Sequence, residues 1–312
     1  MYTSFYGLTE RPFDLSPNPR YLLMTPRHRE ALANLQYGIS SRKSLTLLLG
    51  EAGTGKTTLI RAALASDACR GARVLHLNNP SLTRDEFIEF LGRGFDLGAA
   101  AMSSKATMLH RLESELLERR TAGETIALVV DEAQALPYEL LEEIRMLTNI
   151  ETATEKLLPV VLAGQPELAD RLNEPSMRQL KQRVALRCTL GLLDAVECAA
   201  YIAGRLKVAG GDCAQIFTRE ALKAICQQSG GVPRTVNVIC DNALVNGFAA
   251  GLKPITDALI EDVGREFDLS AAATRHTARP ASAPVAPGGV PAVKESERLF
   301  SASNRKRRFS FF

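Results

Sequence analysis

A glycine-rich segment near residue 50 carries the residue types that bind phosphate. Residues 50–57, GEAGTGKT, follow the pattern G-x-x-x-x-G-K-[ST]. Glycines let a loop wrap closely around an anion, so that several backbone N–H groups point at one phosphate. The positive end of the following helix adds to the attraction. We expect Lys56 to reach the β- and γ-phosphates and the Thr57 hydroxyl to ligate Mg²⁺, so the spacing predicts a nucleoside triphosphate site.

A pair of acids, Asp131 and Glu132, follows the apolar run 126–130. A metal held at a phosphate-binding loop needs a carboxylate from a neighbouring strand. We expect Asp131 to orient Mg²⁺ through water and Glu132 to polarise the water that attacks the γ-phosphate. The alternative, an ordinary solvated acidic turn after a strand, is disfavoured beside a phosphate-binding loop.

Other polar side chains are candidates for completing the chemistry. Gln165 ends an apolar run and could touch the γ-phosphate or the attacking water, although the same residues also fit a plain strand-ending turn. One of three arginines, Arg178, Arg183 and Arg187, could reach a γ-phosphate across a subunit boundary and stabilise the charge of the transition state. Arg183 is the first choice and Arg178 the second, while arginines of this kind are more often solvated surface residues.

Arg234 is expected in the first turn of a helix that begins at Pro233, after Gly230 and Gly231 have ended the preceding helix. A cation is poorly placed for the helix dipole there, so we expect Arg234 to contact a nucleotide phosphate. The predicted ATP-binding residues are Gly50, Glu51, Ala52, Gly53, Thr54, Gly55, Lys56, Thr57, Thr58 and Arg234.

The elements that position these residues alternate between strand and helix. Short apolar runs predict buried strands at 44–50, 72–78, 125–133 and 157–165. Helical periodicity is found at 25–39, 57–65, 83–95, 105–122 and 138–150, and Thr83 with Glu86 forms a capping box. The alternation predicts an α/β fold with a parallel sheet covered by helices on both faces.

Beyond about residue 192 only helical patterns occur, at 194–210, 218–230, 233–251 and 256–267. They predict a small all-helical lid domain. We therefore divide the chain into an N-terminal segment near the nucleotide (1–40), a sheet domain (41–191), a helical lid (192–269) and a tail (270–312). The tail is dominated by Ala, Pro, Ser and Gly and is predicted to be disordered.

The charge distribution separates the tail from the rest. Eight Lys or Arg and two Glu give residues 270–312 a net charge of +6, which leaves −3 for residues 1–269 of a chain whose total is +3. The body is thus unlike a basic nucleic-acid-binding domain. The chain shows neither a signal sequence nor an 18-residue apolar window, and its six cysteines are scattered, so we expect a cytoplasmic protein with reduced thiols.

Together these motifs resemble the AAA+ ATPases, with their phosphate-binding loop, acidic pair, polar sensor, arginine finger and helical lid. The segments FYGLTERPFDLSPNPRYLLMTPRHREALANLQYGI and VLAGQPEL resemble the general secretion pathway A family, and the resemblance extends over residues 1 to about 268. It implies an inner-membrane ATPase that helps to assemble the type II secretion channel with a partner protein. It also implies that Pro19, Arg20 and Tyr21 line the pocket of the base.

Typical members of that family continue into a transmembrane helix and a periplasmic peptidoglycan-binding domain, whereas this chain ends in RKRRFSFF. Basic residues commonly flank the cytoplasmic end of a spanning helix. The alternatives for the tail are a remnant of such a junction, a truncated membrane-anchored form, a peripheral membrane or partner contact, and a solvated basic segment.

The leading hypothesis is an oligomeric AAA+ ATPase that uses Mg-ATP to assemble or remodel a cell-envelope complex, linked to type II secretion or to exopolysaccharide. The alternative is a DNA-linked ATPase of the transposition target-selection type, which DNA would stimulate with a steep dependence on salt. The acidic balance of residues 1–269 counts against DNA. An adaptor that binds nucleotide without hydrolysis is disfavoured by Glu132.

Overall fold

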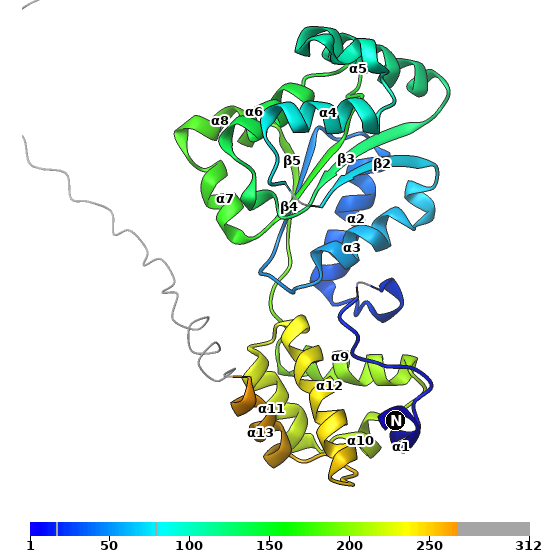
Figure 1. The fold of residues 1–312 in the computed structure, drawn as a ribbon, viewed down its shortest axis with the longest axis vertical. Coiled ribbons are helices and arrows are strands. Elements are labelled where there is room, and N and C mark those ends of the chain that lie inside the picture. Colours follow the sequence, from blue (N-terminus) through cyan, green and yellow to red (C-terminus); the bar gives the residue numbers. More distant parts are fainter. Residues whose placement is uncertain (17, 79, 268–312) are drawn as a thin grey trace, which may run out of the picture. The chain divides into compact units, whose positions relative to one another are not determined.

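The computed structural model describes residues 1–16, 18–78 and 80–267. The tail predicted for residues 270–312 lies outside the described residues. Figure 1 shows a twisted sheet with helices on both faces, followed along the chain by a group of helices.

The sheet has five parallel strands in the order β2-β3-β4-β1-β5. They are β1 (Leu45–Leu49), β2 (Ala72–Leu77), β3 (Thr125–Val130), β4 (Val160–Gly164) and β5 (Val184–Thr189). Every residue of β1 and β4 is buried, as expected for strands covered on both faces. The predicted parallel sheet is confirmed. The sequence patterns missed β5, an edge strand in which exposed residues such as Arg187 interrupt the apolar run.

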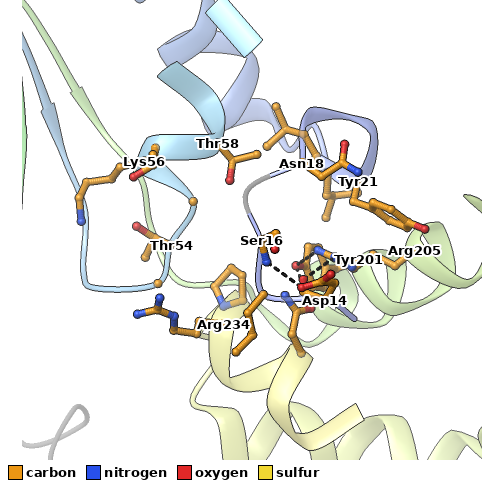
Figure 2. Close-up of a pocket in the computed structure, with 18 of the residues that line it drawn as sticks. Asp14, Ser16, Asn18, Tyr21, Thr54, Lys56, Thr58, Tyr201, Arg205 and Arg234 are labelled. Atoms are coloured by element: carbon orange, nitrogen blue, oxygen red, sulfur yellow. Dashed lines mark hydrogen bonds between the residues drawn. The ribbon is translucent and has the colours of Figure 1, made fainter. Parts of the chain in front are cut away.

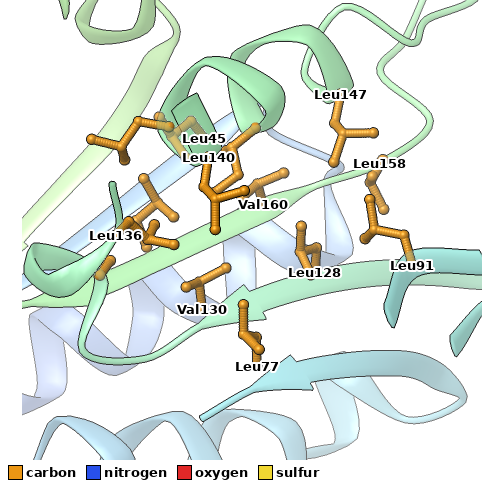
Figure 3. Close-up of a cluster of buried hydrophobic side chains, with 14 of the residues drawn as sticks. Leu45, Leu77, Leu91, Leu128, Val130, Leu136, Leu140, Leu147, Leu158 and Val160 are labelled. Atoms are coloured by element: carbon orange, nitrogen blue, oxygen red, sulfur yellow. The ribbon is translucent and has the colours of Figure 1, made fainter. Parts of the chain in front are cut away.

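Two layers of helices cover the sheet. One face of the sheet packs on α2 (Pro26–Ser40) and α3 (Lys56–Leu64). The other packs on α4 (Arg84–Gly94), α5 (Lys105–Thr121), α6 (Tyr138–Leu147) and α7 (Pro166–Leu172), followed by α8 (Arg178–Lys181). Figure 3 shows leucine and valine side chains of β1, β3 and β4 packed in this second layer. The capping box of Thr83 and Glu86 is present at the start of α4.

The helical region after β5 contains α9 (Ala195–Val208), α10 (Cys213–Ile216), α11 (Arg219–Ser229), α12 (Pro233–Ala249) and α13 (Asp257–Glu266). As expected, α11 is followed by Gly230 and α12 begins at Pro233. An unpredicted first helix, α1 (Tyr2–Tyr6), belongs to the same apolar core. The Tyr6 hydroxyl donates to the Leu252 carbonyl oxygen at 3.0 Å, so the start of the chain packs with the lid.

Short 3₁₀ turns complete the fold: η1 (Pro19–Tyr21), η2 (Asp67–Cys69), η3 (Ala99–Ser103), η4 (Ala133–Ala135) and η5 (Pro175–Met177). All six cysteines lie in the described part of the chain and all are free thiols. None of the described helices is both long and apolar enough to cross a lipid bilayer.

A buried carboxylate joins three helices on one face of the sheet. Glu143 of α6 is 7% exposed, and its Oε1 accepts 2.7 Å hydrogen bonds from Arg84 Nε and Lys105 Nζ. Arg84 and Lys105 are the first residues of α4 and α5, where a cation opposes the helix dipole. Glu143 therefore offsets two unfavourable charges and fixes the starts of both helices.

We predict that Glu143→Ala lowers the free energy of unfolding by about 1–3 kcal/mol, because it removes two charge-assisted hydrogen bonds from a buried acceptor. Glu142→Ala is the matched control: it removes the ion pair with Arg145, in which the Glu142 side chain is 49% exposed. The control should cost about 0.5 kcal/mol or less. Urea unfolding measures both values, and equal losses would contradict the role given to Glu143.

Candidate nucleotide-binding site

The loop between β1 and α3 owes its shape to two glycines. Gly53 and Gly55 have φ angles of +81° and +97°, values that side chains with a Cβ rarely adopt. Gly55 is the N-cap of α3 and has no side chain with which to cap it. Residues 53–58 line a cavity, so the unpaired N–H groups of the first helical turn are available to an anion there.

Lys56 is held against this loop. It is 4% exposed, and its Nζ donates to the carbonyl oxygens of Gly50 at 2.9 Å and Glu51 at 3.2 Å. Burial lowers the pKa of Lys56, while the carboxylates of Glu132 and Asp131 act in the opposite direction. The ammonium therefore stands at the mouth of the loop with two acids nearby.

Thr57 and Asp131 meet across the gap between α3 and β3. The Thr57 hydroxyl donates to Asp131 Oδ2 at 2.5 Å, and Asp131 is 4% exposed. A hydroxyl and a carboxylate are oxygen donors of the kind that Mg²⁺ prefers, usually together with substrate phosphates and water. The described residues contain no group of three or more His, Cys, Asp or Glu side chains that could hold a metal alone. The donor set fits Mg²⁺ delivered with a phosphate.

Glu132 has an unusual backbone. Its φ is +52°, a conformation that costs energy in a residue other than glycine. Its side chain lines the cavity and accepts a 2.6 Å hydrogen bond from Gln134 Nε2. Gln165 follows β4, which lies between β3 and β1 in the sheet. Lys56, Glu132 and Gln165 thus follow the carboxyl ends of three adjacent strands, and of these three residues Lys56 and Glu132 line the cavity whereas Gln165 does not.

Arg234 connects the lid to the loop. Its backbone N–H donates to the Gly53 carbonyl oxygen at 3.2 Å, and a Cβ on Gly53 would lie only 2.6 Å from Arg234 Cβ. Figure 2 shows its guanidinium extending toward the side of the pocket where Thr54 and Lys56 lie. Within the lid, the Leu193 N–H donates to the Gly231 carbonyl oxygen at 2.8 Å.

The whole cavity has a volume of about 930 Å³, including the part that is open to solvent. Its side opposite the phosphate-binding loop is formed by the N-terminal segment and the lid. Arg205 of α9 is 7% exposed and donates to the Pro12 carbonyl at 2.5 Å and the Tyr201 hydroxyl at 2.7 Å. Its guanidinium lies 4.6 Å from the centre of the Tyr21 ring. No motif predicted Arg205, although an arginine on the apolar stripe of an amphipathic helix was the available signal.

The expectation for the base pocket is only partly met. Tyr21 lines the cavity, as does Asn18, but Pro19 and Arg20 do not. The prediction for Arg20 is wrong, because its exposed guanidinium turns to the surface and pairs with Glu10 at 3.2 Å. Residues 50–52 shape the loop without lining the cavity.

The three candidate finger arginines lie away from the cavity of their own chain. Arg178 begins α8, Arg183 immediately precedes β5, and Arg187 lies within β5. Because β5 runs parallel to β1 and Val184 pairs with Leu45, Arg183 stands at the amino end of the sheet. The phosphate-binding loop follows the opposite end. A role for one of them in a neighbouring subunit stays a prediction.

Comparisons with known proteins agree with this geometry. The model of the family described as "AAA domain" matches residues 39–172. General secretion pathway protein A of Aeromonas hydrophila is 44% identical over 252 residues, which are 80% of this chain and 46% of that protein. The chain therefore spans less than half the length of this relative.

Solved structures share the fold at low sequence identity. The Drosophila ORC bound to DNA matches with a TM-score of 0.62 and 18% identity, covering 87% of this chain and 67% of that one. The Aeropyrum pernix ORC2 protein matches with a TM-score of 0.61 and 17% identity, covering 82% of this chain and 71% of that one. A Walker-type ATPase of Pyrococcus abyssi matches with a TM-score of 0.58 and 18% identity, covering 86% of this chain and 79% of that one.

We predict that Gly53→Ala costs more stability than Gly123→Ala. Both glycines have a φ of +81°, so both substitutions carry a backbone cost of about 1–2 kcal/mol. A Cβ at Gly123 meets nothing within 4 Å, whereas at Gly53 it strikes Arg234. Denaturant unfolding gives the difference, and hydrogen exchange at the Arg234 amide should speed up only in Gly53→Ala. Equal stability with unchanged exchange would contradict the contact between loop and lid.

Proposed function

Because the chain belongs to the AAA ATPases similar to general secretion pathway protein A, we propose that it binds ATP with Mg²⁺ and hydrolyses it. One observation carries the proposal. A buried lysine at a glycine loop, a hydroxyl bonded to a buried aspartate and a glutamate on the same cavity all stand at the carboxyl ends of two strands of one parallel sheet, β1 and β3.

The triphosphate lies along the loop at residues 50–58 in this proposal. Backbone N–H groups from Gly53 onward and the Lys56 ammonium bind the β- and γ-phosphates, and Arg234 approaches from the lid. Thr57 and Asp131 would hold Mg²⁺, directly or through water, and the bound ion would supply positive charge next to the phosphate oxygens. The N-terminal segment and Arg205 surround the rest of the nucleotide.

Hydrolysis depends on Glu132. Its carboxylate orients and polarises a water for attack on the γ-phosphate, and Gln165 contacts the γ-phosphate or that water. The left-handed backbone of Glu132 supports this role, because strain is commonly retained where function requires it. One arginine from a neighbouring subunit stabilises the charge of the transition state. Arg183 is the first candidate for this role and Arg178 the second, and the active form is therefore a homo-oligomer.

We further propose that ATP turnover drives assembly or remodelling of a cell-envelope complex, with a partner protein at the cytoplasmic face of the inner membrane. The similarity to general secretion pathway protein A supports this context. In this proposal the basic residues 305–308 contact a membrane or that partner, because clusters of Lys and Arg attract anionic lipid headgroups. DNA is a less favoured partner, because residues 1–269 carry a net negative charge and the likeness to the ORC structures extends to the fold alone.

We predict that Glu132→Gln keeps ATP affinity within a few-fold of wild type while kcat falls about hundredfold or more, since the base is lost and the phosphate contacts remain. Lys56→Ala should instead abolish binding. Exposed Glu139 supplies the control Glu139→Gln, which should behave as wild type. Phosphate release and calorimetry measure the two quantities. Unchanged turnover in Glu132→Gln would contradict the assignment, and salt-sensitive stimulation by DNA would favour the DNA-linked alternative.

We predict that a mixture of Arg183→Ala and Glu132→Gln recovers activity that neither variant has alone. If the arginine acts across a subunit boundary, random mixing pairs intact Glu132 with an intact neighbouring Arg183 at about a quarter of the sites. The same experiment with Arg178→Ala distinguishes the two candidates. Failure of both mixtures to exceed the sum of their components would contradict a finger supplied in trans.

A further inference from the structure

A side chain outside the predicted site, Gln134 of η4, bridges the ends of β3 and β4. Its Nε2 donates to Glu132 Oε2 at 2.6 Å, and its Oε1 accepts from the backbone N–H of Gln165 at 3.0 Å. Gln134 and Gln165 are 31 positions apart in sequence, and the one amide links the loop after β3 to the end of β4.

The partners determine which way the Gln134 amide faces. A backbone N–H can only donate, so the oxygen of the amide must face Gln165. The –NH₂ group is then directed at the carboxylate of Glu132, which accepts when ionised. Both ends of the amide are used, and flipping it would set donor against donor and acceptor against acceptor.

The surroundings hold Gln134 in this place. Arg171 Nη1 donates to the backbone carbonyl oxygens of Gln134 and Leu136, each at 2.7 Å. These two hydrogen bonds fix the turn that carries the glutamine. The Arg171 guanidinium also stacks over the Tyr138 ring at 4.8 Å. A Cβ on Gly164 would lie 2.9 Å from Gln134 Oε1, so the absence of a side chain there gives the amide its room.

We propose that Gln134 is a positioning residue that holds the Glu132 carboxylate in its working orientation and links it to the end of β4. This inference rests on the proposed function, in which Glu132 polarises the attacking water. Glu132 follows a buried strand in a left-handed conformation, and its side chain is only partly buried. The Gln134 hydrogen bond therefore limits where its carboxylate points, and a small displacement of a catalytic group can cost a large factor in rate.

Two substitutions separate positioning of Glu132 from support of β4. Gln134→Ala removes both hydrogen bonds. Gln134→Glu has nearly the same shape and can still accept from the Gln165 N–H, but it sets a second carboxylate against Glu132. We expect Gln134→Ala to lower kcat about tenfold or more with ATP affinity within twofold of wild type. Gln134→Glu should lose at least as much.

The control is Gln227→Ala, which makes the same chemical change at an exposed glutamine of α11 and should leave kcat unchanged. Wild-type kcat in Gln134→Ala would overturn the proposal. A higher kcat in Gln134→Glu than in Gln134→Ala would also overturn it. That result would mean that the hydrogen bond with the Gln165 N–H, and not the one with Glu132, supports activity.

A second measurement does not depend on hydrolysis. In the absence of nucleotide, Gln134→Glu should lower the thermal unfolding temperature through repulsion between the two carboxylates. Adding Glu132→Gln to that variant should raise the temperature again, because the reversed pair can re-form the hydrogen bond. Additive shifts from the two substitutions would show that the side chains do not interact and would overturn the proposal. If wild type failed to hydrolyse ATP while this coupling was present, the proposed function would fail and the contact would stand.

Discussion

The hydrogen bond between Thr57 and Asp131 is the interaction on which the candidate site depends. It joins the first turn of α3, the helix that follows β1, to the end of β3. β1 and β3 are not neighbours in the sheet, because β4 lies between them. Both partners stand at carboxyl ends of parallel strands, where α/β sheets commonly bind ligands. Lys56 is buried as well, and the carboxylates of Glu132 and Asp131 oppose the lowering of its pKa by burial, so opposite charges have been removed from water in one region. Such an arrangement seldom improves stability and more often serves a ligand.

The lid is attached to this site through backbone contacts and through the N-terminal segment. The Gly53 carbonyl oxygen accepts from the Arg234 N–H at the boundary between the phosphate-binding loop and the lid, while Arg205 holds residues 12–14 against α9. The cavity is consequently lined by both parts of the chain. A nucleotide that filled it would contact the loop and the lid together, which is the arrangement by which hydrolysis can change the angle between two domains.

The sequence patterns predicted the chemistry of this site better than its surroundings. The loop at residues 50–57, the Asp131–Glu132 pair and four of the five strands follow from local signals, because buried strands are apolar throughout and glycines occur where φ must be positive. β5 escaped prediction because an edge strand is half exposed. Gln134, Arg205 and α1 escaped because their roles rest on contacts between distant parts of the chain: Tyr6 reaches Leu252 and Arg205 reaches Pro12. Arg20 was misplaced because a resemblance indicates a segment and does not indicate which of its side chains turn inward.

The account is tested most directly by titrating ATP into the wild-type chain in a calorimeter, with and without Mg²⁺, and repeating the titration with Asp131→Asn. If the triphosphate and the metal are held between the loop and the acidic pair, one ATP binds per chain and Mg²⁺ strengthens the binding. Asp131→Asn should then lose most of that Mg²⁺-dependent gain while retaining the metal-independent part. Absence of saturable heat from ATP at millimolar concentration, or a gain from Mg²⁺ that is the same in Asp131→Asn, would contradict the central claim.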